Sequence, residues 1–115
     1  MGFSLDALLS KKEEIEKLLR QLEEERKTIE EKLAKIKAKE DEFYRQATQS
    51  RDPIEASKAE LMLHKIAELR KKYESRLEEV KRKIRGAERE LEEVKMRIEI
   101  VKPKTVKWVV EYEKK

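Results

Sequence analysis

Residues 8–43 read LLSKKEEIEKLLRQLEEERKTIEEKLAKIKAKEDEF, and apolar side chains return in this stretch at every seventh position. One column of the repeat, called d, is unbroken: Leu8, Ile15, Leu22, Ile29, Ile36 and Phe43. The companion a column is mixed: Lys12, Leu19, Arg26, Leu33, Glu40 and Ala47. A seven-residue repeat of this length is typical of a coiled-coil helix, in which charged a positions fix register and partner. The pattern predicts one helix over about residues 5–48, capped by Ser4 or Ser10.

The repeat is interrupted at residues 49–53, QSRDP. Asp52 suits the N-cap of a new helix, and Pro53 suits its first position, where the backbone N–H has no partner to lose. A connection this short favours antiparallel neighbours. We therefore expect a turn at 49–52, a second helix over about 53–101, and an all-α antiparallel coiled-coil hairpin that occupies residues 1–102.

The second helix carries two apolar runs. The later run alternates steps of three and four: Leu77, Val80, Ile84, Ala87, Leu91, Val94, Ile98 and Val101. The earlier run is Met62, Ile66, Leu69 and Tyr73. Two steps of four meet between them, which predicts a stutter that unwinds the supercoil locally. Gly86 lies off the later run. It either splits the helix or is tolerated within it, and the unbroken register favours one helix.

In residues 103–115 the spacing of apolar side chains changes from the heptad pattern to every second position. Apolar side chains alternate with other residues at four positions that would face one way from a strand: Val106, Trp108, Val110 and Tyr112. Such alternation of β-branched and aromatic residues predicts a short β-strand tail. A lone strand leaves backbone groups unpaired, so we expect it to pair with the same tail of a second protomer or with the open sheet edge of a partner.

Some large apolar residues lie beside the heptad columns, so the apolar stripe along each helix is wider than the single seam where the two helices would pack. The six expected in an oligomer interface are Leu5, Leu9, Leu18, Leu61, Leu63 and Ile100. A hairpin buries one stripe per helix, and a wider stripe needs a second neighbour. The alternative is that these side chains are tolerated on the surface. We expect burial by a second protomer, that is, a homodimer.

The composition limits the chemistry. The chain has 115 residues, 49% of them charged, with 30 Lys+Arg against 26 Asp+Glu and a net charge of +4. It contains no cysteine and one histidine, His64, so disulfides, zinc–thiolate sites and cysteine nucleophiles are excluded. We expect no catalytic residues, no metal site and no cofactor. The excess of Lys and Glu without Asn or Cys predicts a thermophilic source.

Membrane and nucleic-acid partners need separate consideration. No apolar stretch approaches the roughly 20 residues that span a bilayer, so a cytoplasmic protein with no membrane partner is expected. The candidate phosphate contacts are the basic residues of the second helix: Arg70, Lys71, Lys72, Lys81, Arg82, Lys83 and Arg85. Phosphate contacts bind a nucleic-acid backbone without reading its sequence. Interleaved glutamates favour a solvated face over such a stripe.

The leading expectation is a non-enzymatic interaction or scaffold protein, which oligomerises and presents its C-terminal strand to itself or to an unknown protein. The first alternative is a nucleic-acid-associated protein that acts through the basic residues of the second helix. The second is a chaperone-like clamp that uses the apolar end of the hairpin.

Overall fold

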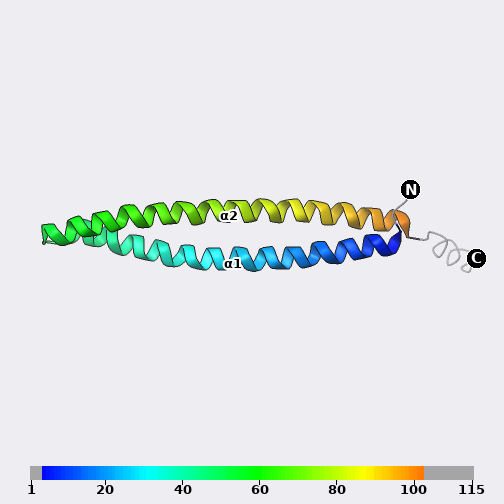
Figure 1. The fold of residues 1–115 in the computed structure, drawn as a ribbon, viewed down its shortest axis with the longest axis horizontal. Coiled ribbons are helices and arrows are strands. Elements are labelled where there is room, and N and C mark those ends of the chain that lie inside the picture. The colour runs from blue at the N-terminus through cyan, green and yellow to red at the C-terminus, as the bar shows by residue number, and fades with distance from the viewer. Residues whose placement is uncertain (1–3, 103–115) are drawn as a thin grey trace, which may run out of the picture. The chain divides into compact units, whose positions relative to one another are not determined.

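The structure is a computed structural model that describes residues 4–102. This part of the chain is all-helical and consists of two long helices that pack together, α1 (Leu5–Gln49) and α2 (Pro53–Val101) (Figure 1). The predicted all-α fold with two packed helices is confirmed. The observed ranges differ from the expected ones by one residue, at the end of α1.

Each helix begins at a side-chain cap. The N–H of Ala7 donates to Ser4 Oγ at 3.1 Å, and the N–H of Ile54 donates to Asp52 Oδ1 at 3.0 Å. These caps satisfy N–H groups that have no backbone partner in a first helical turn. The predicted N-cap at Asp52 is confirmed. Ser4 rather than Ser10 caps α1, since Ser10 lies inside the helix.

The chain divides into two compact units, each of which is described separately. The hairpin unit is residues 21–84, and the terminal unit consists, in the described part of the chain, of residues 4–20 and 85–102. Within the hairpin unit α1 and α2 run antiparallel, because only residues 50–52 join them (Figure 1). Within the terminal unit the start of α1 packs against the end of α2.

The core of the hairpin unit is a single aliphatic seam. Its buried side chains are Leu22, Ile29, Leu33 and Ile36 from α1 and Ala59, Val80 and Ile84 from α2. The terminal unit has the same construction, with Leu8, Ile15, Ala87, Val94 and Ile98 buried. Five of the six d-column residues of α1 are buried and Phe43 is half-buried. The heptad columns of α1 were therefore read correctly from the sequence.

The seam of α2 differs from the prediction in its first half. Met62 and Leu69, expected in the seam, are 43% and 40% exposed. Ala67 and Glu74 are half-buried beside the seam, and the seam itself consists of buried or half-buried residues: Ala56, Ala59, Leu63, Ile66, Arg70, Tyr73 and Leu77. The seam residues are spaced alternately three and four positions apart, and this spacing continues unbroken into the later apolar run from Leu77 onwards. The predicted stutter is therefore wrong. An uninterrupted heptad keeps one side of α2 turned towards α1, even though it places Arg70 in the seam.

Gly86 does not divide α2, which is continuous through it. Its φ is not in the left-handed region, and a Cβ added to it would meet no atom within 4 Å. Nothing in its surroundings therefore requires a glycine at this position.

Candidate functional site

A charged cluster lies at the seam of the hairpin unit. The guanidinium of Arg70 donates from Nε to Glu40 Oε2 on α1 at 2.8 Å and from Nη1 to Glu74 Oε1 at 3.0 Å. The Arg70 and Glu40 side chains are only 27% and 25% exposed. Glu40 is one of the charged a positions for which the sequence predicts control of register. Arg70, which the sequence suggested as a phosphate contact, is its partner on the other helix.

The cluster also perturbs the arginine itself. Hydrogen bonding to Glu40, and next to Glu74, raises the pKa of Arg70 above its ordinary value. A base with a raised folded-state pKa stabilises the fold fully below its ordinary pKa and loses that contribution only as the pH rises through the raised value. Arg70 is thus charged throughout the neutral range, which suits it to hold two carboxylates rather than to exchange protons.

Tyr73 lies one helical turn from Arg70, and one cationic side chain from each helix lies over its ring. The Lys32 ammonium is 5.6 Å and the Arg76 guanidinium carbon is 5.3 Å from the centre of the Tyr73 ring. Lys32 Nζ also donates to the Tyr73 hydroxyl at 3.4 Å. Both ring distances lie within the range of cation–π attraction. Lys32 and Arg76 therefore lie on the same side of the helix pair.

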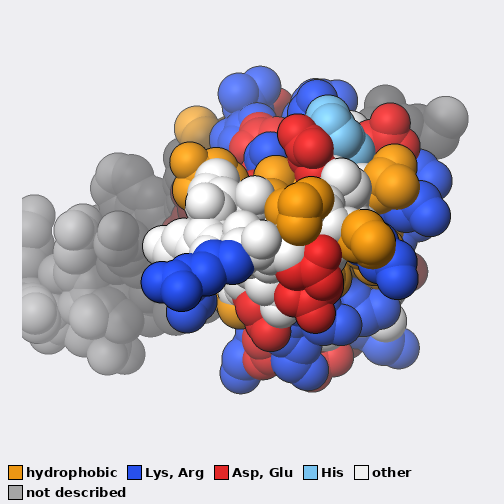
Figure 2. All heavy atoms as spheres, turned by 90° about the vertical axis from the view of Figure 1, so that its left-hand side faces the viewer, with side chains coloured by type: hydrophobic (Ala, Val, Ile, Leu, Met, Phe, Trp, Pro, Cys, Tyr) orange, Lys and Arg blue, Asp and Glu red, His pale blue; other side chains and the backbone are white. Residues whose placement is uncertain are grey.

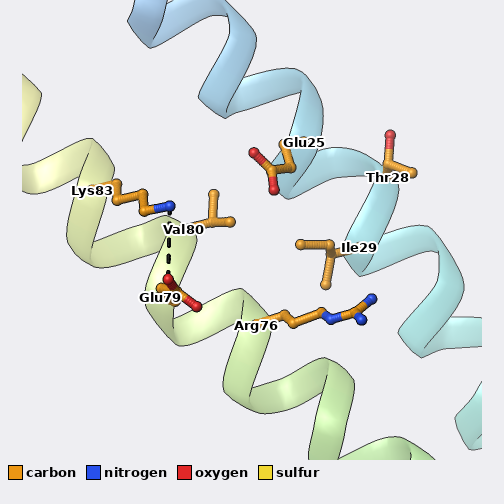
Figure 3. A pocket seen from close by; sticks show the side chains of 7 residues that line it. All are labelled: Glu25, Thr28, Ile29, Arg76, Glu79, Val80 and Lys83. Carbon is orange, nitrogen blue, oxygen red and sulfur yellow. Dashed lines mark ion pairs between the residues drawn. The ribbon is translucent and has the colours of Figure 1, made fainter.

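Two open grooves follow this side of the hairpin unit. The first is lined by Glu25, Thr28, Ile29, Arg76, Glu79, Val80 and Lys83. Figure 3 shows Lys83 turned to Glu79, its ion-pair partner at 3.7 Å, with Arg76 reaching towards α1. The second groove is lined by Phe43, Gln46, Ser50, Glu55, Lys58, Ala59 and Met62. Lining residues of the two grooves are separated by whole heptads on each helix, as with Ile29 and Phe43 on α1 and Val80 and Ala59 on α2. Both grooves therefore lie on the same face of the hairpin unit.

Six lysines lie on this face, five of them between the two grooves and one, Lys58, in the lining of the second groove. This lysine face consists of Lys32, Lys35 and Lys39 from α1 and Lys58, Lys65 and Lys72 from α2. Within residues 4–102 none of the six makes an ion pair. Sequence reasoning missed this face because it searched for adjacent basic residues. The signal was present as lysines at seven-residue spacing on α2, at positions 58, 65 and 72.

The predicted phosphate contacts do not share one face. Arg70 is held in the seam, Lys81 is half-buried, and Lys83 is paired with Glu79. The remaining ones are exposed: Lys71, Lys72, Arg82 and Arg85. Of these, Lys72 belongs to the lysine face, while adjacent residues of a helix point in different directions. The structure therefore spreads the predicted stripe around α2.

The predicted oligomer interface is also divided. Leu5 and Leu63 are half-buried, and both lie on columns that belong to the seams of their units. The four others are exposed: Leu9, Leu18, Leu61 and Ile100. The exposed large apolar residues that were not predicted to lie in the interface are Tyr44, Ile54, Met62, Leu69, Met96 and Val101. The predicted strand residues Val106, Trp108, Val110 and Tyr112 lie outside the described residues.

Chemistry beyond these contacts is limited in the described part of the chain. Residues 4–102 contain no group of three or more His, Cys, Asp or Glu side chains arranged to hold a metal ion. No helix over the same residues has the length and apolar character needed to cross a bilayer. His64 is exposed on α2. Comparison of the chain with protein-family models, with curated proteins and with solved structures finds no match.

Proposed function

We propose that this protein is a non-enzymatic coiled-coil interaction protein that forms a homodimer and presents its C-terminal segment for strand pairing. The observation that supports dimerisation is the apolar surface left over after the seams are filled. Ile54, Leu61, Met96 and Ile100 are 64–70% exposed, and all four lie on the outer side of α2. Single apolar residues on a surface need no explanation, but several along one helix favour burial by a partner.

Sedimentation of the pure protein tests the homodimer. We expect about twice the monomer mass of 13.8 kDa. Leu61→Glu places a charge on the proposed interface and should shift the protein towards monomer without loss of helicity, because Leu61 takes no part in the seam. Ala38→Glu is the matched control, since it adds the same charge to the exposed outer side of α1. A wild-type monomer at tens of micromolar would contradict the proposal.

The C-terminal tail, residues 103–115, is the segment that would pair as a strand. The alternation of Val106, Trp108, Val110 and Tyr112 favours a strand that needs a partner edge. Deletion of residues 103–115 should weaken the dimer if two tails pair with each other. Trp108 is the only tryptophan, so its emission reports on the same segment. A red, readily quenched emission together with an unchanged dimer mass would instead indicate a tail that binds another protein.

The lysine face supports a second candidate function, the binding of a nucleic-acid backbone. Six lysines without an ion pair on one side of the hairpin unit would contact phosphates without reading bases. Duplex DNA should then bind with an affinity that falls steeply with salt. Lys35→Glu and Lys39→Glu should each lower the slope of log affinity against log salt by about 1. Lys17→Glu, in the other unit, is the control, and no binding at low salt removes this candidate.

A further inference from the structure

Two exposed apolar side chains, called here the apolar row, stand on the lysine face. Met62 and Leu69 are 43% and 40% exposed. They are one heptad apart on α2, and Arg76 lies one heptad beyond Leu69 on the same column. Met62 lines the second groove and Arg76 lines the first, so this column follows the face on which both grooves lie. Figure 2, a view onto the end of the hairpin unit, shows exposed apolar side chains (orange) among charged ones (blue and red).

A column of lysines on α2 borders the apolar row on the side away from α1. Lys58, Lys65 and Lys72 are spaced by seven, and each is three or four residues from Met62, Leu69 or both. Residues at these separations are neighbours on a helix surface. All three lysines are exposed, and none makes an ion pair within residues 4–102. Positive charge therefore lies beside the apolar row along its whole length.

Lysines of α1 border the apolar row on its other side. Lys32 Nζ lies 5.6 Å from the centre of the Tyr73 ring, which shows how the two helices align here. The helices run antiparallel, so Lys39, one heptad further along α1, comes level with Ile66, one heptad earlier on α2. That level is the middle of the apolar row.

The lysine border on α1 is shorter than the one on α2. After Lys39 the same two columns of α1 continue with Glu42 and Gln46. Leu69 therefore has lysines on both sides, whereas Met62 has them on the α2 side alone. Leu69 is thus the centre of a surface that is apolar in the middle and basic at both edges.

An acidic amphipathic helix has the complementary form. Its apolar heptad positions would cover the apolar row, and carboxylates on either side of that stripe would reach the lysines of α1 and α2. Lys58 and Lys72 are two heptads apart, or about 21 Å along the axis, so a helix of about three heptads covers the surface. A nucleic-acid backbone would use the lysines but leave Met62 and Leu69 uncovered. An anionic bilayer needs a broader apolar face than two side chains.

We propose that the lysine face is a docking site for an acidic amphipathic helix of another protein. The helix packs its apolar stripe on Met62 and Leu69, and its carboxylates pair with the lysines on both sides. The two helices of the hairpin unit then become part of a three-helix coiled coil. The proposal rests on the interaction function proposed above, but it needs neither the homodimer nor the C-terminal tail, because every residue it uses lies in the hairpin unit.

A synthetic peptide of about three heptads, with leucine at a and d and glutamate at e and g, is the probe. Repulsion between its glutamates disfavours association of the peptide with itself, so helix gained on mixing with the full-length protein reports docking. Isothermal titration calorimetry measures the affinity. We expect saturable binding, and binding at least ten-fold weaker for a peptide with the same leucines and lysine at e and g.

Two matched pairs of variants locate the site. Lys72→Glu should weaken peptide binding roughly ten-fold, whereas Lys71→Glu, adjacent but on another column of α2, should bind nearly as the wild type does. Leu69→Ser should also weaken binding roughly ten-fold, because it removes the centre of the apolar row. Its control is Leu18→Ser, a 44% exposed leucine of the terminal unit. Far-ultraviolet circular dichroism checks that all four variants remain helical.

The outcomes distinguish this inference from the function on which it rests. A wild-type monomer that binds the acidic peptide supports the docking site and contradicts the homodimer alone. A dimer that does not bind the peptide, or that loses binding equally in Lys71→Glu and Lys72→Glu, overturns the docking site alone. Equal binding of polyglutamate, or unchanged binding in Leu69→Ser, overturns the helix as occupant, because charge would then suffice. Binding of duplex DNA or of phosphatidylserine vesicles, without binding of the peptide, overturns the proposal in favour of that ligand.

Discussion

The hairpin unit and the terminal unit each close a helix pair over an aliphatic seam, but their ion pairs between α1 and α2 differ in place. In the hairpin unit Arg70 and Glu40 meet at 2.8 Å with side chains about one-quarter exposed. In the terminal unit Lys11 and Glu90 meet at 3.7 Å with side chains about half exposed. The first pair occupies the seam itself and the second lies on its rim. The stability of the fold should therefore depend strongly on the seam pair, because a buried charge needs its partner, and only weakly on the exposed rim pair.

The largest expected effect concerns the aliphatic seam that both units share. Ile29→Ala should destabilise the fold by about 2–3 kcal/mol, because the side chain is 7% exposed and its loss leaves a gap between the helices. Tyr44→Ala is the matched control. Its side chain is 59% exposed and lies outside the proposed dimer interface, so the change should cost less than about 0.5 kcal/mol. Urea unfolding of both variants measures the difference, and equal costs would mean that the seam is not the core.

The next effect compares the two ion pairs. Arg70→Leu should lower the melting temperature clearly, because it leaves Glu40 in the seam without a partner. Arg70→Leu with Glu40→Leu should restore it, since two apolar residues fit a seam position as well as an ion pair does. The corresponding cycle of Lys11 and Glu90 should give a coupling of about 0.2–1 kcal/mol that falls with added salt. Couplings of equal size and salt dependence would remove the distinction between seam and rim.

The smallest effect addresses the start of the terminal unit's α2 segment. Gly86→Ala should stabilise the protein by about 0.5–1 kcal/mol, because alanine restricts the unfolded chain and its Cβ meets no atom within 4 Å. Thermal unfolding followed by circular dichroism measures the change. Arg85→Ala, at the preceding exposed position, is the control and should have little effect. Destabilisation by Gly86→Ala would mean that a function or a partner requires the glycine.

Sequence reasoning recovered the helices but only part of the candidate surfaces. Leu61 and Ile100 were expected in an interface and are exposed, whereas Leu63 was expected beside them and lies at a seam position. Met96 was missed, because it was not read with the glutamates one turn away from it. The lysine face was missed for a related reason, since its members come from two helices and their proximity depends on how α1 and α2 align.

The sequence by itself determined the heptad of α1, the break at residues 49–53 and the cap at Asp52, because these depend on local geometry and on a repeat within one segment. Only the tertiary structure decided which stripe of α2 meets α1 in the hairpin unit. Met62 and Leu69 are more hydrophobic than Ala59 and Arg70, so the helix taken alone favours the wrong stripe. Packing reverses that preference. Continuous heptad contact with α1 fixes the orientation of α2, and Glu40 gives Arg70 a partner that no single-helix pattern reveals.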